Sequence, residues 1–423
     1  MELIKTSFLS AFGVLAKIIA LLGINKILAV YVGPSGYAVI GQFQTFVQSV
    51  STAASGGINS GVTKYTAEFG GEPNRQHVVW SAAAVLCIFG SIAISIPTIV
   101  FRNYIAENVL GNVMFSKPLV LFSISLIFFV FNTFFIAILN GKKEIKYLMV
   151  TNVAGSVFSL VVVGVLTYLG GLLGALTGLA IYQALTFFVS LAVLVRMPWF
   201  QWGYFGLGIN IGVIRQLLKY SLMTIASLLC MPVALLFLRN HLGTTLGWET
   251  AGYWEAMWRL SAAFLMLFTT TLSVYYLPKF SELSSKSDIR KEILFGVKVI
   301  LPVVFLSALV IFLFRDQLVF ILFSAKFKPM ESLFGWQLVG DFLKVPAWML
   351  GYLMISKALV KRFVFTEIIF TLSFVLLAKT MIKSNGLDGM AMAYAINYGM
   401  YLLALCVLMK DYLFTKADTS GKE

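Results

Sequence analysis

The pentapeptide LPKFS occupies residues 277–281, and Arg290 follows its last residue by nine positions. An earlier part of the chain carries nearly the same pattern. There the pentapeptide VTKYT occupies residues 62–66, and Arg75 again lies nine positions after it. The two patterns are 215 residues apart, which is far longer than a solenoid unit of about 20 to 50 residues. This spacing indicates a duplicated half-protein rather than a repeat array.

Other matches keep nearly the same separation. The offset is 214 between residues 5–8 and 219–222, 216 between 146–147 and 362–363, and 215 between the glycine-bearing stretches 171–174 and 386–389. A separation this constant predicts two homologous domains. We place the N-terminal half with its linker at residues 1–205 and the C-terminal half at residues 206–423.

The composition places the chain in a lipid bilayer. Hydrophobic residues make up 59% of the 423 residues and charged residues only 12%, whereas soluble domains carry about 25% charged residues. The apolar runs are about 20 residues long, which is the length of a helix that crosses the hydrocarbon core. They lack the alternation over about ten residues that a membrane β-strand shows. The sequence therefore predicts an all-α membrane protein.

Six apolar runs fall in each half. They cover residues 8–31, 37–59, 78–101, 118–139, 147–169 and 172–195, and then 216–238, 251–276, 293–314, 333–356, 363–383 and 387–409. We therefore expect 12 transmembrane helices in two pseudo-symmetric six-helix bundles. Because six is even, both halves start and end on the same side and insert in the same orientation.

Positive charge sets the expected orientation. The net charge is +14, and most lysine and arginine residues lie on the side that holds both termini. The positive-inside rule makes that side cytoplasmic. The charge is thus an insertion signal, and no nucleic-acid partner is expected. The aromatic segment at residues 197–205 joins the halves and is expected to lie along the cytoplasmic interface.

The sequence lacks the residues for several kinds of chemistry. Cys87, Cys230 and Cys406 all lie inside apolar runs, which argues against a disulfide framework or a metal cluster. Two histidines are too few for a zinc site, and no P-loop motif is present. We therefore expect no cofactor, no bound metal and no catalytic residue.

Charged residues inside the apolar runs are the first functional candidates. A charge at the bilayer centre costs about 3 kcal/mol or more unless it is paired or hydrated. Five charged residues lie deep in their runs: Lys17, Glu255, Arg259, Asp341 and Lys344. Lys298 and Glu367 lie about one turn inside the cytoplasmic boundary, where long side chains can reach headgroups.

The repeat provides a control on these charges. The equivalent positions of the other half are uncharged: Met231 for Lys17, Val39 for Glu255, Phe43 for Arg259, Ser125 for Asp341 and Phe128 for Lys344. Charges that serve only helix packing would be expected in both halves, so the asymmetry favours an asymmetric ligand or a coupling ion. The alternative is that these charges only neutralise each other within one helix. Glu255 and Arg259 have the spacing of such an ion pair, and so do Asp341 and Lys344.

The second apolar run carries a row of uncharged polar residues. They fall within about 80° of one helical face: Gln44, Gln48, Ser51, Ser55 and Asn59. Such a row can hydrogen-bond sugar hydroxyls, and it can also join two membrane helices. In the eighth run, Trp254 and Trp258 flank Glu255. We expect them in an outer aromatic belt, with stacking on sugar rings as the alternative.

Three stretches carry a family likeness: VTKY at residues 62–65, LPKF at 277–280 and, above all, WQLVGDFLK at 336–344. They resemble the polysaccharide flippases of the MOP transporter superfamily, in particular those that move O-antigen units or lipid III, the enterobacterial common antigen intermediate. The resemblance extends over nearly the whole chain. It implies a transporter rather than an enzyme. Such a protein moves an oligosaccharide on undecaprenyl diphosphate from the cytoplasmic to the periplasmic leaflet of the bacterial inner membrane by alternating access.

The resemblance also implies roles for the candidate residues. Cations would bind the diphosphate or an acidic sugar: Lys17, Arg259 and Lys344, of which Arg259 departs from the residues common in this branch. The polar face from Gln44 to Asn59 would hydrogen-bond the sugars. The candidates for ion coupling or ion pairs are Glu255, Asp341, Lys298 and Glu367. The expected partners are the membrane, the lipid-linked oligosaccharide, the glycan polymerase and the chain-length regulator.

Two other functions stay open. A cation-coupled multidrug exporter of the same superfamily should favour anionic cavity residues, whereas here the deep cations slightly outnumber the deep acids. A membrane glycan polymerase should carry more acid and base groups than the external loop near 315–332 offers. The lipid II flippases are disfavoured, because that branch usually has 14 spans.

Overall fold

The computed structural model of the chain describes residues 19–205 and 210–413. Every regular element in these ranges is a helix. The chain divides into two compact units, Met1–Asn240 and His241–Glu423. The boundary falls inside one long helix, α9 (Ile211–Leu246), most of which belongs to unit 1.

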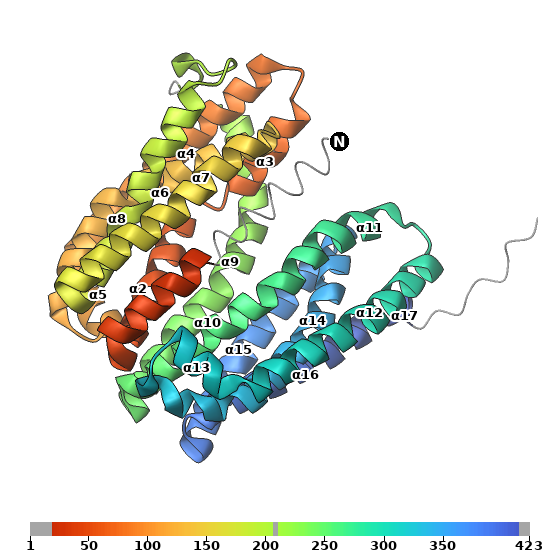
Figure 1. The fold of residues 1–423 in the computed structure, drawn as a ribbon. Coiled ribbons are helices and arrows are strands. Elements are labelled where there is room, and N and C mark those ends of the chain that lie inside the picture. The colour runs from red at the N-terminus through yellow and green to blue at the C-terminus, as the bar shows by residue number, and fades with distance from the viewer. Residues whose placement is uncertain (1–18, 206–209, 414–423) are drawn as a thin grey trace, which may run out of the picture. The chain divides into compact units, whose positions relative to one another are not determined.

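Unit 1 is a bundle of long helices joined by short connections (Figure 1). After the apolar helix Ile19–Tyr31 come α2 (Gly33–Ala54), α3 (Asn59–Glu68), α4 (Pro73–Val100), α5 (Arg102–Leu110), α6 (Ser116–Gly141), α7 (Ile145–Phe158), a π-helical turn (Ser159–Val163), α8 (Gly164–Val195) and the first part of α9. Helix α6 packs against α8, α4 and α3. Its phenylalanines fill the space between these helices, and Phe122, Phe129 and Phe134 are fully buried. The core of unit 1 is therefore organised around α6.

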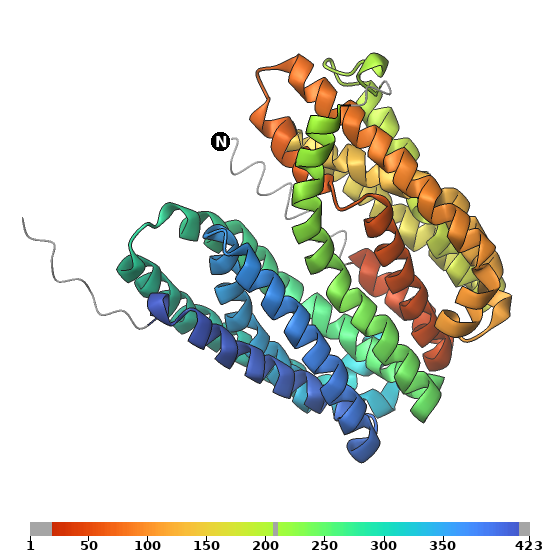
Figure 2. The same ribbon diagram turned by 180° about the vertical axis from the view of Figure 1, so that it is seen from behind.

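Unit 2 has α14 at its centre. Its elements are α10 (Trp248–Thr271), a π-helical turn (Leu272–Tyr276), α11 (Leu277–Glu282), α12 (Lys286–Leu313), α13 (Arg315–Leu322), a 3₁₀ segment (Ala325–Leu333), α14 (Phe334–Ser356), α15 (Val360–Asn385), α16 (Asp388–Leu408) and α17 (Lys410–Leu413). Helix α14 packs along α16 and also contacts α12, α10 and α15, and Figure 2 shows α14, α15 and α16 side by side. A Cβ at Gly340 of α14 would collide with the Tyr394 ring of α16, so this close packing requires glycine.

The predicted spans coincide with helices in the described ranges. Seven segments there are long and apolar enough to cross a membrane: Pro73–Val100, Val113–Gly141, Ile145–Val195, Lys286–Leu313, Ala325–Ser356, Val360–Asn385 and Asp388–Leu408. The segment Ile145–Val195 contains two predicted spans, separated by a kink at Gly171. Helix α9 covers the predicted span at 216–238, and α10 together with the π-helical turn Leu272–Tyr276 covers the span at 251–276. The predicted span at 8–31 begins outside the described residues.

The predicted extent of the second span is wrong. The apolar run at residues 37–59 predicts one helix, but α2 ends at Ala54 and α3 starts at Asn59. Between them Gly56 and Gly57 have φ values of 60° and 64°, a left-handed conformation that glycine adopts at little cost. Adjacent glycines are a helix-ending signal, and the surrounding apolar run concealed it.

The repeat is visible in the backbone as well as in the sequence. Lys143 (φ 59°) and Ala358 (φ 53°) are the two non-glycine residues with positive φ in the described ranges, and they are 215 residues apart. Gly33 (φ 72°) and Gly247 (φ 95°), 214 residues apart, stand at the starts of α2 and α10. The two halves therefore use the same turns. The division into domains at residue 205 stays a prediction.

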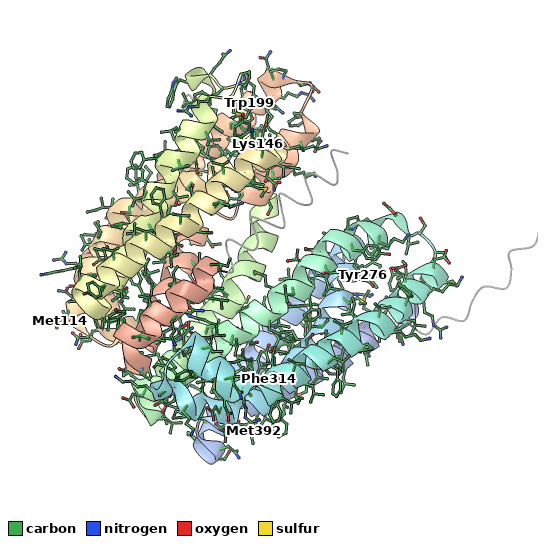
Figure 3. All side chains as sticks on the ribbon, viewed as in Figure 1. Met114, Lys146, Trp199, Tyr276, Phe314 and Met392 are labelled. Atoms are coloured by element: carbon green, nitrogen blue, oxygen red, sulfur yellow. The ribbon has the colours of Figure 1, made fainter. Side chains whose placement is uncertain are left out.

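Figure 3 shows which residues share an end of each unit. In unit 1, Lys146 and Trp199 lie at one end and Met114 lies at the other. In unit 2, Tyr276 lies at one end and Phe314 lies at the other. Within each unit this arrangement agrees with the predicted alternation of sides. The cytoplasmic location of the termini stays a prediction, because the chain ends lie outside the described residues.

The aromatic segment at 197–205 is held to the end of unit 1 through Trp199. The Lys142 ammonium lies 5.2 Å from the ring centroid of Trp199 and 5.4 Å from that of Trp80. It also donates a hydrogen bond of 2.5 Å to Gln76 Oε1. On the other side, Trp199 Nε1 donates to Glu144 Oε1 at 3.4 Å. These contacts fix the start of the linker on α4, α6 and the loop before α7.

Candidate functional site

A cavity of about 410 Å³ opens in unit 1 along one face of α2. All five polar residues predicted from the second apolar run line it: Gln44, Gln48, Ser51, Ser55 and Asn59. The opposite wall includes Thr133 of α6 and the pair Tyr182 and Gln183 of α8. Although the helix breaks after Ala54, the turn through Gly56 and Gly57 returns Asn59 to the same cavity. We call this space the polar cavity.

The polar cavity presents uncharged groups with unused hydrogen-bonding capacity. The Ser51 hydroxyl and the Asn59 amide oxygen have no hydrogen-bond partner among the described residues. On the far wall, Gln183 Nε2 donates to Tyr182 Oη at 2.9 Å. Amides and hydroxyls can each donate and accept, so this cavity suits a neutral ligand with many hydroxyl groups.

A second cavity, of about 250 Å³, lies in unit 2 between α10 and α14. Helix α14 contributes Lys344 and Trp348, and the α10 wall includes Trp258, Ser261 and Thr269. The predicted cation Lys344 is therefore at a cavity surface, although its side chain is largely buried. We call this space the cationic cavity.

Four aromatic rings surround the Lys344 ammonium. Its Nζ lies 4.7 Å from the ring centroid of Tyr398, 4.8 Å from Trp348, 5.2 Å from Tyr394 and 5.4 Å from Trp258. A cation within about 6 Å of an aromatic centroid is attracted to the negative face of the ring. The rings thus stabilise a buried charge and present flat faces beside it.

The predicted pair Asp341 and Lys344 is connected through a third residue. Lys344 Nζ donates to the Tyr394 hydroxyl at 3.2 Å, and that hydroxyl donates to Asp341 Oδ1 at 2.8 Å. Ser261 Oγ also donates to Asp341 Oδ1, at 2.6 Å, and accepts from Gln337 Nε2 at 3.2 Å. The link therefore runs through the Tyr394 hydroxyl rather than along the helix alone. We call this chain of hydrogen bonds the Asp341 relay.

Glu255 and Arg259 form the local ion pair that the sequence analysis kept as an alternative. Arg259 Nε lies 2.6 Å from Glu255 Oε1, and the two side chains are 11% and 5% exposed. The charge of Arg259 is compensated by its neighbour on α10. A substrate-binding role for Arg259 stays a prediction, and the structure offers it less support than it offers Lys344.

The two cavities occupy equivalent positions of the repeat. Six residues of α2 and its end correspond to six residues of α10 at an offset of 214: Gln44 to Trp258, Val47 to Ser261, Gln48 to Ala262, Ser51 to Leu265, Thr52 to Met266 and Ser55 to Thr269. Gly33 and Gly247, at the starts of these helices, have the same offset. The predicted pairing of Glu255 with Val39 and of Arg259 with Phe43, at an offset of 216, is therefore wrong, and the equivalent residues are Gly41 and Thr45, which are also uncharged. The duplicated scaffold thus contains a cavity in each half. One is lined by neutral amides and hydroxyls, and the other by aromatic and apolar groups around one cation.

A buried polar link in unit 1 escaped the sequence analysis. Arg239 of α9 is 1% exposed and donates from Nη1 to Gln42 Oε1 of α2 at 2.8 Å. Gln42 Nε2 donates in turn to the carbonyls of Val109 and Leu236, at 3.2 and 3.0 Å. Arg239 directly follows the apolar run at residues 216–238, so the sequence alone predicts that it lies in a loop. The structure instead encloses it between α9 and α2.

The remaining predicted residues lie elsewhere. Lys17 lies outside the described residues. Lys298 is exposed on α12, away from the lining of the cationic cavity. Glu367 is half-buried on α15 and accepts a hydrogen bond of 3.1 Å from Tyr401 Oη.

The expected outer aromatic belt is wrong for Trp254 and Trp258. Trp254 is fully buried, and Trp258 lines the cationic cavity beside Lys344. The sequence does not predict a site role for Tyr394, Tyr398 or Trp348, because nothing in their spacing separates them from other membrane aromatics. The repeat gives a signal for Trp258 only at the offset of 214, which places Trp258 opposite Gln44. The offset of 216 that pairs Arg259 with Phe43 places Trp258 opposite Gln42.

This helical fold is similar to that of solved MOP superfamily transporters. An inward-facing multidrug resistance MATE family transporter of that superfamily matches with a TM-score of 0.81 and 17% identity, covering 95% of this chain and 96% of that one. The lipid II flippase MurJ in an inward closed conformation matches with a TM-score of 0.74 and 16% identity, covering 97% and 89%. The prediction of an all-α membrane protein with about 12 helices is confirmed.

The sequence defines the family more narrowly. The polysaccharide biosynthesis protein family matches residues 3–284. The lipid III flippases of Escherichia coli (strain K12) and Shigella flexneri are each 32% identical over 415 residues, covering 96% of this chain and 98% of theirs. The chain belongs to this family of polysaccharide biosynthesis proteins. The predicted likeness to polysaccharide flippases is confirmed. The prediction that the protein is a transporter rather than an enzyme is confirmed as well.

Proposed function

We propose that this protein moves an undecaprenyl-diphosphate-linked oligosaccharide from the cytoplasmic to the periplasmic leaflet of a bacterial inner membrane by alternating access. Lipid III is the first candidate cargo, because it is the substrate named for relatives that align from end to end. An O-antigen unit is the second. The glycan polymerase and the chain-length regulator belong to the proposal as partners that receive the cargo.

One observation carries this proposal: the polar cavity and the cationic cavity hold contrasting chemistry at equivalent positions of the repeat. A lipid-linked oligosaccharide has the same two kinds of group. Its neutral sugars need hydrogen-bond partners, and its diphosphate or acidic sugars need a positive charge. Gln44, Gln48 and Asn59 would serve the first need, and Lys344 with its aromatic rings would serve the second.

The alternative of a multidrug exporter for cationic compounds gains no support from this arrangement. A cationic drug would meet the ammonium of Lys344 at the cavity in unit 2 and only neutral groups at the cavity in unit 1. Like charges repel strongly where water is scarce. The likeness to MATE transporters, at 17% identity, concerns the fold.

The experiment that tests the proposal deletes the gene in its bacterial host and follows the lipid intermediate. We expect an undecaprenyl-diphosphate oligosaccharide to accumulate in the cytoplasmic leaflet, as detected by mass spectrometry and by protection from an external glycosidase. A plasmid copy should clear it. Unchanged lipid intermediates together with new sensitivity to cationic drugs would support the exporter instead.

A further inference from the structure

The α8 wall of the polar cavity presents a phenol that can donate a hydrogen bond. Tyr182 lines the cavity, and its Oη accepts from Gln183 Nε2 at 2.9 Å. The ring packs edge-to-face on Phe129 of α6, with 6.3 Å between the ring centroids. A phenol both accepts and donates. Because the oxygen already accepts from Gln183, the hydroxyl proton of Tyr182 is available to a ligand in the cavity.

The opposite wall presents an acceptor. Asn59, the first residue of α3, lines the cavity, and its Oδ1 is enclosed without a hydrogen-bond partner among the described residues. The Ser51 hydroxyl of α2 is in the same state. An amide oxygen can only accept, and buried polar atoms are nearly always hydrogen-bonded. The Asn59 oxygen therefore indicates a ligand that brings a donor to this wall.

The cavity also has an apolar part, where α2 and α8 contact each other. Val47 of α2 and Leu179 of α8 line it and are 8% and 3% exposed. Val47 lies one turn before Ser51, and Leu179 lies one turn before Tyr182, so each helix turns an apolar and a polar side chain to the same space. A methyl group is stabilised on such a surface, whereas a hydroxyl there loses its water without gaining a partner.

We propose that the polar cavity is a subsite for an acetamido sugar, and that Tyr182 and Asn59 determine this specificity. The Tyr182 hydroxyl donates to the acetyl carbonyl, and Asn59 Oδ1 accepts from the amide N–H. The acetyl methyl lies on the apolar surface of Val47 and Leu179. This inference rests on the proposed function, since it assumes a cargo that carries sugars. It assigns the choice of sugar to α8 as well as to the row on α2.

The acetamido group matches the cavity in each of its parts. A secondary amide is planar and trans, so its carbonyl and its N–H point in opposite directions, as a donor on one wall and an acceptor on the other require. A plain hydroxyl can pair with either wall but leaves the apolar surface unused. A charged amine or carboxylate is disfavoured, because every described lining residue is uncharged and a buried charge needs a partner.

The size of the cavity suits part of the cargo. Its volume of about 410 Å³ lies at the lower end of the range for ligand pockets, about 300–1,000 Å³. Such a space holds one or two sugar units rather than a whole lipid-linked oligosaccharide. The subsite therefore distinguishes sugars by one substituent and leaves the rest of the cargo outside it.

The test measures binding of two matched probes to the purified full-length chain in lipid nanodiscs by calorimetry. Both probes are synthetic undecaprenyl-diphosphate trisaccharides. One carries an N-acetyl group on C2 of each sugar, and the other carries a hydroxyl in each of these places. We expect the acetamido probe to bind about tenfold more tightly, because a site built around one polar group rejects analogues that lack it.

Variants locate the specificity. Tyr182→Phe keeps the ring and removes only the hydroxyl, so it should weaken binding of the acetamido probe and bring the two affinities close together. Asn59→Leu removes the acceptor on the other wall and should have the same effect on the ratio of affinities. Tyr168→Phe is the matched control, because Tyr168 lies on the same helix and is 68% exposed. It should keep the wild-type ratio.

The outcomes separate this inference from the proposed function. Equal binding of the two probes by the wild type overturns the acetamido subsite and leaves the flippase proposal intact. A preference that persists in both Tyr182→Phe and Asn59→Leu overturns the assignment of specificity to these residues. A ratio that falls equally in Tyr168→Phe overturns it as well. Absence of binding of either probe by the wild type counts against the proposed cargo itself.

Discussion

Gly171 and Gly386, which are 215 residues apart, have the same backbone conformation: φ 56° and ψ −133° at the first, and φ 58° and ψ −133° at the second. This region is open to glycine almost alone. Three residues later, a Cβ at Gly174 or at Gly389 would collide with a backbone carbonyl of the preceding helix. Both halves therefore use one glycine-dependent turn to reverse the chain between their last two spans.

This relationship predicts that Gly386→Ala lowers the free energy of unfolding by about 1–3 kcal/mol, the cost of forcing a side chain into such a conformation. Thermal unfolding in detergent measures the change. Gly71→Ala is the matched control, because Gly71 has no neighbour within 4 Å and no positive φ. Equal effects of the two substitutions would show that the backbone conformation at Gly386 carries no special cost.

Gln48→Leu should reduce export of the glycan while leaving the protein's abundance unchanged. The substitution removes an amide from the polar cavity, and one neutral hydrogen bond contributes about 1 kcal/mol, or roughly fivefold. Surface glycan is measured by immunoblot and protein by an epitope tag. Ile124→Leu, on the exposed face of α6, is the control. If the two variants behave alike, the row on α2 serves helix packing.

Gln42→Leu should act on stability instead. It removes the acceptor of the buried Arg239 guanidinium, and hydrogen bonds to a charged group contribute about 1.5–3 kcal/mol. We expect a lower unfolding temperature, and a double variant with Arg239→Met that is more stable than the sum of the single effects predicts. Strictly additive effects would contradict a coupled pair.

Glu255 and Arg259 should also behave as a unit. Glu255→Gln leaves an uncompensated arginine in α10, and Arg259→Gln leaves an uncompensated carboxylate, so each should destabilise the protein more than the double variant does. Neighbouring residues in one ion pair show coupling energies of about 0.5–3 kcal/mol. The measurement is a double-mutant cycle by chemical unfolding. A coupling energy near zero would contradict a functional ion pair between Glu255 and Arg259.

Lys344→Gln should lower export by about tenfold or more, because a charge-assisted contact contributes about 1.5–3 kcal/mol. The double variant Lys344→Gln with Asp341→Asn removes both charges and should fold well, yet still fail to export. Lys298→Gln, at an exposed position on α12, is the control. Normal glycan display by the double variant would remove Lys344 from the binding site.

Much of the fold could be predicted because lipid imposes simple rules. A span must be apolar for about 20 residues, so ten of the twelve runs agree with helices by length alone. The first predicted span begins outside the described residues, and the second predicted span is too long because its helix ends before Gly56. The offset of 214 to 216 revealed the duplication without any structure. The helical spacing of Gln44, Gln48 and Ser51 gave the polar cavity, because residues on one face of a helix meet the same space.

The rest of the site depends on contacts between distant residues. Tyr394 lies 53 residues from Asp341 along the chain, and no local pattern indicates that its hydroxyl joins Asp341 to Lys344. The aromatic rings around Lys344 come from α10, α14 and α16. Helix packing decides which tyrosine or tryptophan faces a cation and which faces lipid. The amino-acid composition does not distinguish the two cases.

The central claim is that this protein moves a lipid-linked oligosaccharide between leaflets. The most direct measurement reconstitutes the purified chain into liposomes with fluorescent undecaprenyl-diphosphate oligosaccharide and follows its exposure to an external glycosidase. We predict that nearly all of the probe becomes accessible with the wild-type chain, and only the outer-leaflet half with the double variant Lys344→Gln and Asp341→Asn. Accessibility that stays at the outer-leaflet half with the wild-type chain, under a proton gradient of either direction, would contradict the account.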